Sequence, residues 1–323
     1  MDVLYYGNKN DSCSSFIREI TNLNNKAWFL LLLLAFIWGA SFYFIGEGIN
    51  YVPPLTLVWY RILFAAISLY LLLLWQRKKL PTQFDFWFSV SIMALLNNII
   101  PFTLIAWGQQ TISGGLAAIL NSNTAFAAVF IAAIFIPSEP LGARRVIGTL
   151  IGIIGVVLVI GMDALTEITL TSISQLAILL ATISYALGSV WGKTRLSSYK
   201  PLDIACGTLL VGSVIIAPIM VLADGIPDLA AFEWKFMTIL IGLSIAGTAF
   251  AYIVYYRILE LAGASSLMLV TIIVPIFAVS IDAIILSKWI SAQTLGGFVI
   301  ISLGLSLIDG RIWWLIAKRL KAR

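Results

Sequence analysis

Ten long apolar segments follow one another along the 323 residues of this chain. Hydrophobic residues make up 61% of the sequence and charged residues only 11%, too few to cover a water-soluble fold. A helix needs about 20 apolar residues to cross the hydrocarbon core of a membrane. Long, continuously apolar runs favour such helices over the alternating strands of a barrel. The sequence therefore predicts an all-α integral membrane protein with ten transmembrane helices, at residues 28–48, 55–75, 87–107, 113–136, 144–162, 172–192, 203–223, 236–256, 264–286 and 292–308.

The second five segments echo the first five at a nearly fixed distance along the chain. Trp38 and Pro54 correspond, 147 residues later, to Tyr185 and Pro201. Because five is an odd number, the second set must cross the membrane in the opposite direction from the first. We therefore expect two inverted five-helix repeats between two tails, with bounds at 1–26, 27–163, 164–309 and 310–323.

Lysine and arginine are concentrated on one side of this arrangement. With the N-terminus inside, seventeen of the twenty fall in inside segments, and the other three are Lys235, Lys288 and Arg61. Cytoplasmic loops hold an excess of these residues. We expect a multi-pass protein of the cell inner membrane with both termini cytoplasmic. The net charge of +5 is the sum over two membrane faces of opposite charge, so it does not indicate a nucleic-acid partner.

The residues and motifs that several kinds of catalysis and metal binding require are absent from this sequence. The absence of histidine removes the most common metal ligand and general base. Nucleophile elbows, phosphate loops and dinucleotide fingerprints are also missing, and the loops are too short for a folded soluble domain. We expect no enzymatic activity, metal or cofactor. The expected partners are a small-molecule substrate and the lipid bilayer.

Two pairs of glycines with GxxxG spacing allow close helix packing. They are Gly148 with Gly152 in the fifth segment and Gly188 with Gly192 in the sixth. Such faces join either the two halves of the chain or two protomers of a homodimer.

An ordered set of residues in both halves resembles the EamA family of the drug/metabolite transporter superfamily. The set consists of Trp38, Gly39, Ala40, Ser41, Phe42, Pro54, Arg61, Glu139, Gly148, Gly152, Gly155, Pro275, Gly297 and Gly304. The resemblance extends over nearly the whole chain after residue 27. It implies ten helices in two inverted halves that move small organic metabolites, often amino acids or related compounds, and commonly outward.

The chain departs from the family pattern at two places. The family usually has a proline in span four, where this chain has Thr124 to Phe126. It also has a Gly-Glu after span nine, where this chain has Ser287 and Lys288. The lysine reverses the expected charge, so a role for that glutamate does not carry over.

Polar side chains deep in the spans are the first candidates for a substrate path, because in lipid they need a protein or water partner. Asn97 and Asn98 lie in span three close to Pro101, which has no backbone donor. These two asparagines either line a cavity or bond neighbouring helices.

A run of four polar residues interrupts span four. Residues 121–124 point in all directions around a helix, so they cannot all face one neighbour. At least one is expected to line a wet cavity, and Asn121 and Asn123 are the candidate substrate contacts.

Aromatic and hydroxyl side chains form a second group of candidates. Trp38 and Tyr185 occupy matching positions near the middle of spans one and six, which favours a cavity over the interfacial belts. Rings with polar tips suit an organic substrate that has an apolar part. The group consists of Trp38, Ser41, Trp107, Tyr185, Ser189, Tyr252 and Tyr256.

Two charged residues lie well inside spans, and an unpaired charge is costly there. Arg61 and Asp282 are each half of an ion pair, a substrate contact or a coupling group. For Arg61 we expect helix capping or a carboxylate partner such as Glu47, and for Asp282 a pairing with Lys288 or simple snorkelling toward the interface. Neither residue is an obvious proton-binding site near the middle of the membrane. The sequence therefore favours a facilitator or exporter without an obvious proton site.

The sequence thus predicts a transporter that exports a small organic metabolite by alternating access of its two halves. A non-transporting receptor or scaffold is the alternative from another class, but the short loops supply little binding surface. A channel-like facilitator is a third reading, and no charged ring or carbonyl filter supports it.

Overall fold

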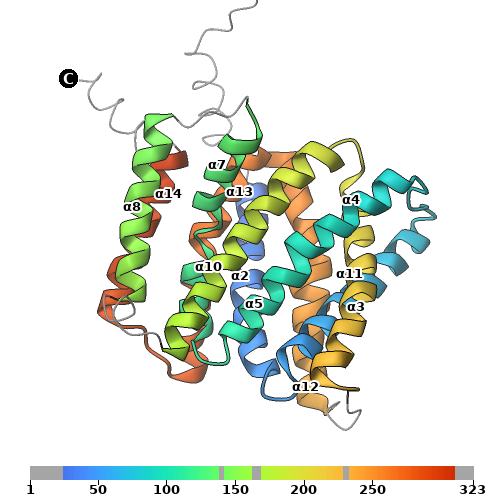
Figure 1. Ribbon diagram of the computed structural model, residues 1–323, viewed down its shortest axis with the longest axis horizontal. Helices are drawn as coiled ribbons and strands as arrows, with labels where there is room; N and C mark the ends of the chain where they lie inside the picture. The colour runs from blue at the N-terminus through green and yellow to red at the C-terminus, as the bar shows by residue number, and fades with distance from the viewer. Residues whose placement is uncertain (1–24, 138–141, 162–168, 228–232, 310–323) are drawn as a thin grey trace, which may run out of the picture.

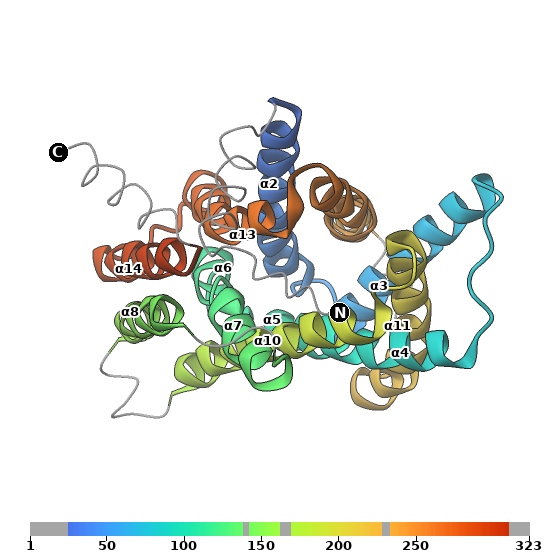
Figure 2. The ribbon, with the colours of Figure 1, turned by 90° about the horizontal axis from the view of Figure 1, so that it is seen from above.

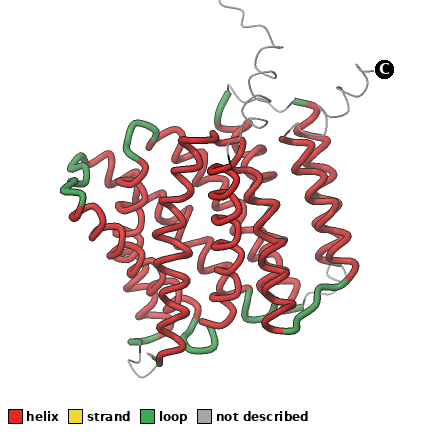
Figure 3. Tube along the Cα trace, turned by 180° about the vertical axis from the view of Figure 1, so that it is seen from behind, coloured by secondary structure: helices red, strands yellow, loops and turns green. Residues whose placement is uncertain are grey.

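A computed structural model describes residues 25–137, 142–161, 169–227 and 233–309, apart from the side chains at 263–266 and 268. Within these ranges the structure is built from helices joined by short loops at the two ends of a bundle (Figure 3). The ends of the chain and Glu139 lie outside the described residues.

The first half contains five membrane-length helical stretches, two of them built from more than one helix. Nonpolar side chains around most of each stretch suit burial against lipid and neighbouring helices. Its elements are α2 (Asn25–Gly48), α3 (Pro54–Trp75), α4 (Phe84–Ala94), η1 (Leu95–Ile99), α5 (Ile100–Gly108), α6 (Gly114–Asn121), α7 (Thr124–Phe135) and α8 (Ala143–Ile160).

The second half repeats this order. Its elements are α10 (Leu170–Trp191), η2 (Gly192–Leu196), α11 (Pro201–Asp224), α12 (Trp234–Leu240), η4 (Ile241–Phe250), α13 (Ala251–Leu286) and α14 (Ala292–Asp309). Among the described residues, nine stretches are long and apolar enough to span a membrane, and 292–308 is a shorter apolar helix. The predicted set of ten apolar helices in a multi-pass membrane protein is confirmed.

The helices alternate in direction, so the two halves are inverted relative to one another. In Figure 1, α2 starts at the upper end of the bundle and α10 starts at the lower end. The closest packing joins one half to the other: α2 with α13, α3 with α11, α5 and α7 with α10, and α8 with α14. If each helix is replaced by the corresponding helix of the other half, the same set of helix pairs results. An approximate two-fold axis between the halves requires this.

Helix α13 folds back on itself between its two apolar parts. Trp38 of α2 contacts Tyr255, with ring centroids 6.0 Å apart, and the adjacent Gly39 packs against Phe277. In a straight helix, Tyr255 and Phe277 would be about 33 Å apart. The two ends of α13 therefore both lie against α2, as two crossings of the bundle (Figure 2).

The glycine faces are used within the chain. A Cβ at Gly155 would lie 2.8 Å from the carbonyl oxygen of Gly297, and one at Gly148 would lie 2.8 Å from that of Gly304. This contact joins α8 and α14, a pair at one edge of the bundle (Figures 1 and 2). Gly188 likewise faces η1. These faces join the two halves of one chain.

Candidate functional site

Arg61 of α3 is buried among residues of four other helical elements, α5, α10, η4 and α13. Its side chain is only 7% exposed. The guanidinium carbon lies 3.7 Å from the centroid of the Phe102 ring of α5, a cation–π contact. The Nε atom donates a hydrogen bond of 2.9 Å to the hydroxyl of Thr248 in η4. Tyr185 and Tyr252 are its electrostatic neighbours. We call these five residues the Arg61 cluster.

The Thr248 hydroxyl is fixed by the π-helical turn in which it lies. It donates its own proton to the carbonyl oxygen of Leu243, five residues earlier, at 2.9 Å. Its lone pairs therefore remain available to accept from Arg61. The π-helical stretch η4 is ten residues long, and π-helical segments within α-helices are frequent at functional sites.

The expected pairing of Arg61 with Glu47 is wrong. The Glu47 carboxylate lies 3.7 Å from the ammonium of Lys235, at one end of the bundle. In the described part of the chain, the contacts of Arg61 are a hydroxyl and aromatic rings. Glu47 lies near the end of α2, just before Arg61's helix in the sequence, but its partner Lys235 comes from the other half.

The two asparagines of span three bond one tyrosine of span eight. Asn98 and Asn97 donate from Nδ2 to the hydroxyl oxygen of Tyr252, at 3.1 and 3.3 Å. Helix-to-helix bonding, one of the two readings from the sequence, is therefore present. Because Tyr252 belongs to the Arg61 cluster, these hydrogen bonds place both asparagines at the edge of that cluster.

Pro101 explains why the helix changes its pitch at the asparagines. In the π turn η1, Ile100 donates to the carbonyl oxygen of Leu95, five residues back. Pro101 has no N–H with which to continue the pattern to Leu96. The Ser184 hydroxyl of α10 donates to that carbonyl at 2.7 Å instead. A side chain of the other half thus completes the interrupted helix.

A chain of rings extends from the Arg61 cluster to α2. Tyr252 stacks on Tyr256 with centroids 6.4 Å apart, Tyr256 meets Tyr255 edge-on at 5.3 Å, and Tyr255 lies beside Trp38. The predicted candidates Trp38, Tyr252 and Tyr256 are therefore brought together. We call Trp38, Tyr255, Tyr256 and Tyr252 the aromatic chain.

Several polar tips in this region keep accessible surface and have no hydrogen-bond partner in the described part of the chain. They are the two terminal nitrogens of Arg61 and the hydroxyls of Tyr185 and Tyr256. A guanidinium offers paired donors in a plane, which suits a carboxylate. The arrangement can hold an anionic group at Arg61 and an apolar group against the rings.

Three other candidates lie apart from these rings. Trp107 is 38% exposed and has no ring contact among the described residues. Ser189 is exposed and donates to the carbonyl of Ala186 in its own helix. Ser41 is buried, donates to the carbonyl of Ile37 and packs on Gly247 of η4.

The polar run in span four breaks the helix. Ser122, Asn123 and Thr124 each donate to the carbonyl oxygen three residues earlier, at 2.6 to 2.8 Å. Short polar side chains compete in this way with the backbone pattern of a helix, so α6 ends at Asn121 and α7 starts at Thr124. Within the described residues, the Asn121 side-chain oxygen is buried without a partner.

Asp282 caps a helix of the other half. Its Oδ2 atom accepts from the backbone N–H of Gly115 at 2.7 Å, and Ser113 is a further hydrogen-bond partner. The expected pairing with Lys288 is present only as a longer-range attraction: Lys288 is an electrostatic neighbour of the Asp282 carboxylate, but the two side chains form no salt bridge among the described residues. The backbone N–H of Lys288 donates to the carbonyl oxygen of Asp282. A carboxylate at the N-terminus of α6 is stabilised by the free N–H groups there.

Replacing Tyr252 by phenylalanine is expected to lower thermal stability, because two asparagine amides lose their acceptor. Asn98 is fully buried, so an unpaired amide there costs about 1–3 kcal/mol. The melting temperature in detergent measures the loss. Tyr256→Phe is the matched control, since that hydroxyl has no hydrogen bond in the described part of the chain. Equal melting temperatures of both variants would contradict the assigned bonds.

A model of the EamA-like transporter family matches residues 25–161 and matches again over 172–309. This chain belongs to the EamA-like transporter family. The sequence resemblance is confirmed, and so is the class of protein, a membrane transporter.

The relatives of this EamA-like transporter include proteins of several bacteria. An uncharacterized transporter, YoaV of Bacillus subtilis, is 23% identical over 85% of this chain and 94% of its own length. A probable amino-acid metabolite efflux pump of Salmonella typhimurium is 25% identical over 88% and 94%. A solved crystal structure shares the fold, with a TM-score of 0.63, 16% identity and coverage of 88% and 96%.

Some residues of this EamA-like site were not predicted from the sequence. Thr248 is one of three serine and threonine residues in span eight, which was a usable signal. Ser184 could not be predicted, because its partner is a backbone carbonyl and such a bond cannot be recognised in the sequence.

Proposed function

We propose that this chain exports a small organic metabolite bearing a carboxylate, an amino acid or a related compound, by alternating access of its two halves. The buried Arg61 guanidinium carries this proposal, because it has no carboxylate partner in the described part of the chain. Tyr185 and Tyr252 are electrostatic neighbours of the guanidinium, and their rings suit an apolar substituent of the substrate. The printed name of the Salmonella relative, a probable amino-acid metabolite efflux pump, supports the same class of cargo.

The two halves meet at the Arg61 cluster, which supports a rocking mechanism. Arg61 and Phe102 belong to the first half, whereas Thr248, Tyr185 and Tyr252 belong to the second. A movement of one half against the other changes access to the guanidinium from either side. Binding at the interface of inverted repeats is a common transporter design.

We propose that transport follows the substrate gradient, without a proton-coupling carboxylate. The buried acidic residues among the described ones are Asp203 and Asp282. Asp203 lies in the first turn of its own helix α11, and Asp282 caps α6. Neither contacts the Arg61 cluster, so substrate binding is not tied to their protonation. The proposal contains no catalytic step.

We further propose that the protein lies in the cell inner membrane with both termini cytoplasmic. The loop at 76–83 and the segment at 192–200 lie at the same end of the bundle, the upper end in Figure 1, and both are rich in lysine and arginine. Positive loops stay in the cytoplasm. We call this end of the bundle the basic end.

Purified protein in liposomes tests the proposed function. The liposomes are loaded with a mixture of the protein amino acids, and the released compounds are identified by mass spectrometry. Selective release of some amino acids, unchanged when a pH gradient is imposed, is expected. Release equal to that from protein-free liposomes contradicts amino-acid transport, and a steep dependence on the gradient contradicts the coupling proposal. An ion current across a planar bilayer indicates a channel instead.

A further inference from the structure

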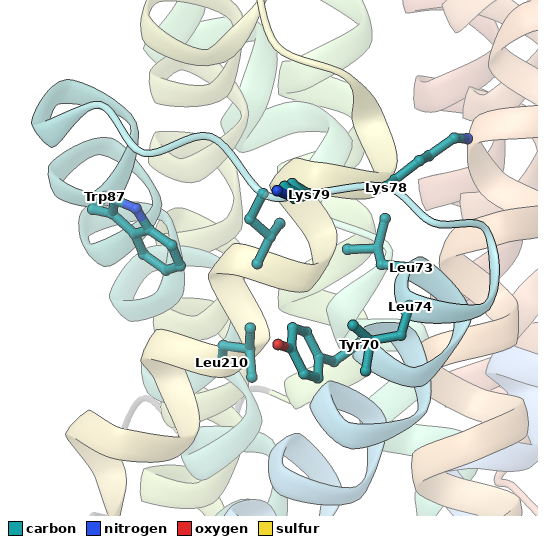
Figure 4. Close-up of a pocket in the computed structure, with 8 residues that line it drawn as sticks. Tyr70, Leu73, Leu74, Lys78, Lys79, Trp87 and Leu210 are labelled. Atoms are coloured by element: carbon teal, nitrogen blue, oxygen red, sulfur yellow. The ribbon is translucent and has the colours of Figure 1, made fainter.

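A groove of about 410 Å³ lies at the basic end between α3, α4 and α11, away from the Arg61 cluster. Lys78 and Lys79 lie at its rim, Tyr70 and Trp87 supply rings, and Leu73 and Leu210 supply apolar surface. In Figure 4, Lys79 lies above the groove, Lys78 extends to one side, and the Tyr70 hydroxyl points toward Leu210. The groove thus combines cationic tips with an apolar floor.

The end of α3 places the two lysines. The backbone N–H of Lys78 donates to the carbonyl of Leu73 and that of Arg77 to the carbonyl of Leu74, which closes a Schellman motif. Arg77 takes the left-handed conformation that this motif requires, with φ of 52°. The chain then turns sharply, so that Lys79 lies over the groove and Lys78 lies at its side, and neither is on a continued helix.

The opposite wall is also fixed. The indole N–H of Trp87 donates to the carbonyl oxygen of Pro81 at 3.0 Å. This bond ties the start of α4 to the loop that carries the lysines. The indole face is thereby held beside the groove.

Exposed rings on either side indicate the depth of the groove in the membrane. Trp75 is 81% exposed and Phe84 is 79% exposed, at the end of α3 and the start of α4. Aromatic rings in such places lie at the level of the lipid headgroups. Below the lysines, Tyr70 and Leu74 are 42% and 52% exposed on the side where lipid chains lie.

We propose that this groove binds the phosphodiester headgroup of an anionic phospholipid from the surrounding leaflet. Lys78 and Lys79 form no ion pair with a protein carboxylate among the described residues, so their charges are available to a phosphate. Tyr70 and Trp87 provide hydroxyl and indole surface at headgroup level, and the leucines below contact the first methylenes of an acyl chain. Basic pockets between transmembrane helices bind anionic headgroups in this manner. The site is independent of the substrate site.

The test measures lipid retention by native mass spectrometry after release of the protein from nanodiscs. The nanodiscs contain equal parts of phosphatidylglycerol and phosphatidylcholine, with the unmodified protein as reference. Retention of phosphatidylglycerol over phosphatidylcholine is expected. The double variant with Lys78→Gln and Lys79→Gln is expected to lower the retention of phosphatidylglycerol by roughly tenfold or more. Each of the two cations near the membrane surface adds a similar amount to the free energy of binding the anionic headgroup.

Two further variants separate this groove from general attraction to a basic surface. Arg144→Gln with Arg145→Gln removes the same charge at the start of α8 and is expected to leave retention unchanged. Leu210→Trp fills the groove without changing charge and is expected to reduce retention. Equal losses in the lysine and arginine pairs would overturn the proposal, as would full retention in Leu210→Trp.

Competition distinguishes the two sources of a phosphodiester. Soluble glycerophosphoglycerol has the same headgroup chemistry without acyl chains, and it is expected not to displace the lipid at millimolar concentration. Displacement by it would mean that the groove binds a soluble phosphate compound and would contradict a lipid site. The melting temperature of each variant in phosphatidylcholine alone shows whether its fold is intact.

Discussion

Arg61→Gln is expected to reduce transport of a carboxylated substrate by roughly tenfold to a hundredfold, because a hydrogen bond to a charged group contributes about 1.5–3 kcal/mol. The guanidinium is 7% exposed, and its two terminal nitrogens have no partner in the described part of the chain. Glutamine keeps hydrogen-bonding groups but removes the charge and the planar fork. Initial rates of release from liposomes measure the effect.

Arg61→Lys separates charge from geometry. It keeps the positive charge but loses the Nε donor to Thr248 and the flat contact with Phe102, so transport is expected to stay well below that of the unmodified protein. Arg257→Gln is the matched control, because Arg257 pairs with Glu260 on the exposed surface. The ratio of rates for an amino acid and for its amide is the decisive readout. If Arg61→Gln leaves that ratio unchanged, Arg61 does not contact the carboxylate.

Thr248→Val gives a further test that leaves the arginine in place. It removes the acceptor of Arg61 Nε with little change of volume, whereas Thr248→Ser preserves it. We expect slower transport in the valine variant and near-normal transport in the serine variant. Equal rates in both would show that the orientation of the guanidinium does not depend on this hydroxyl.

The architecture follows from features that are local in the sequence. The length of each apolar segment determines the number of spans, and an odd number per repeat determines the inversion. Trp38 and Tyr185 became candidates because the repeat places them at matching positions and because polar tips are rare at mid-span. These properties can be recognised in the sequence without knowing which helices pack together.

The partners of polar side chains do not follow from the sequence in the same way. Glu47 pairs with a lysine 188 residues later, and Asp282 binds a backbone N–H 167 residues earlier. Asn123 was a candidate substrate contact from the sequence, and its amide donates to the carbonyl oxygen of Leu120 in its own chain segment. A side chain that bonds nearby backbone looks the same in sequence as one that faces substrate.

Gly304→Ala is expected to lower stability, although alanine is the better helix former. A Cβ at Gly304 would lie 2.5 Å from the carbonyl oxygen of Gly148 and 2.9 Å from the backbone nitrogen of Gly152. Both atoms are backbone of α8, so no side chain can move aside and the two helices must separate. Overpacking of this kind costs about 1–3 kcal/mol. A lower melting temperature in detergent measures it.

Gly296→Ala in the same helix is the matched control, because a Cβ there would meet nothing within 4 Å. Alanine is favoured over glycine in a helix by about 1 kcal/mol, so this variant is expected to melt at the same temperature or higher. The same substitution thus has opposite effects at two positions of α14. Unchanged or increased stability of Gly304→Ala would mean that α8 and α14 do not pack through their glycines. In that case the glycine faces would be free to join two protomers, the alternative that the sequence alone left open.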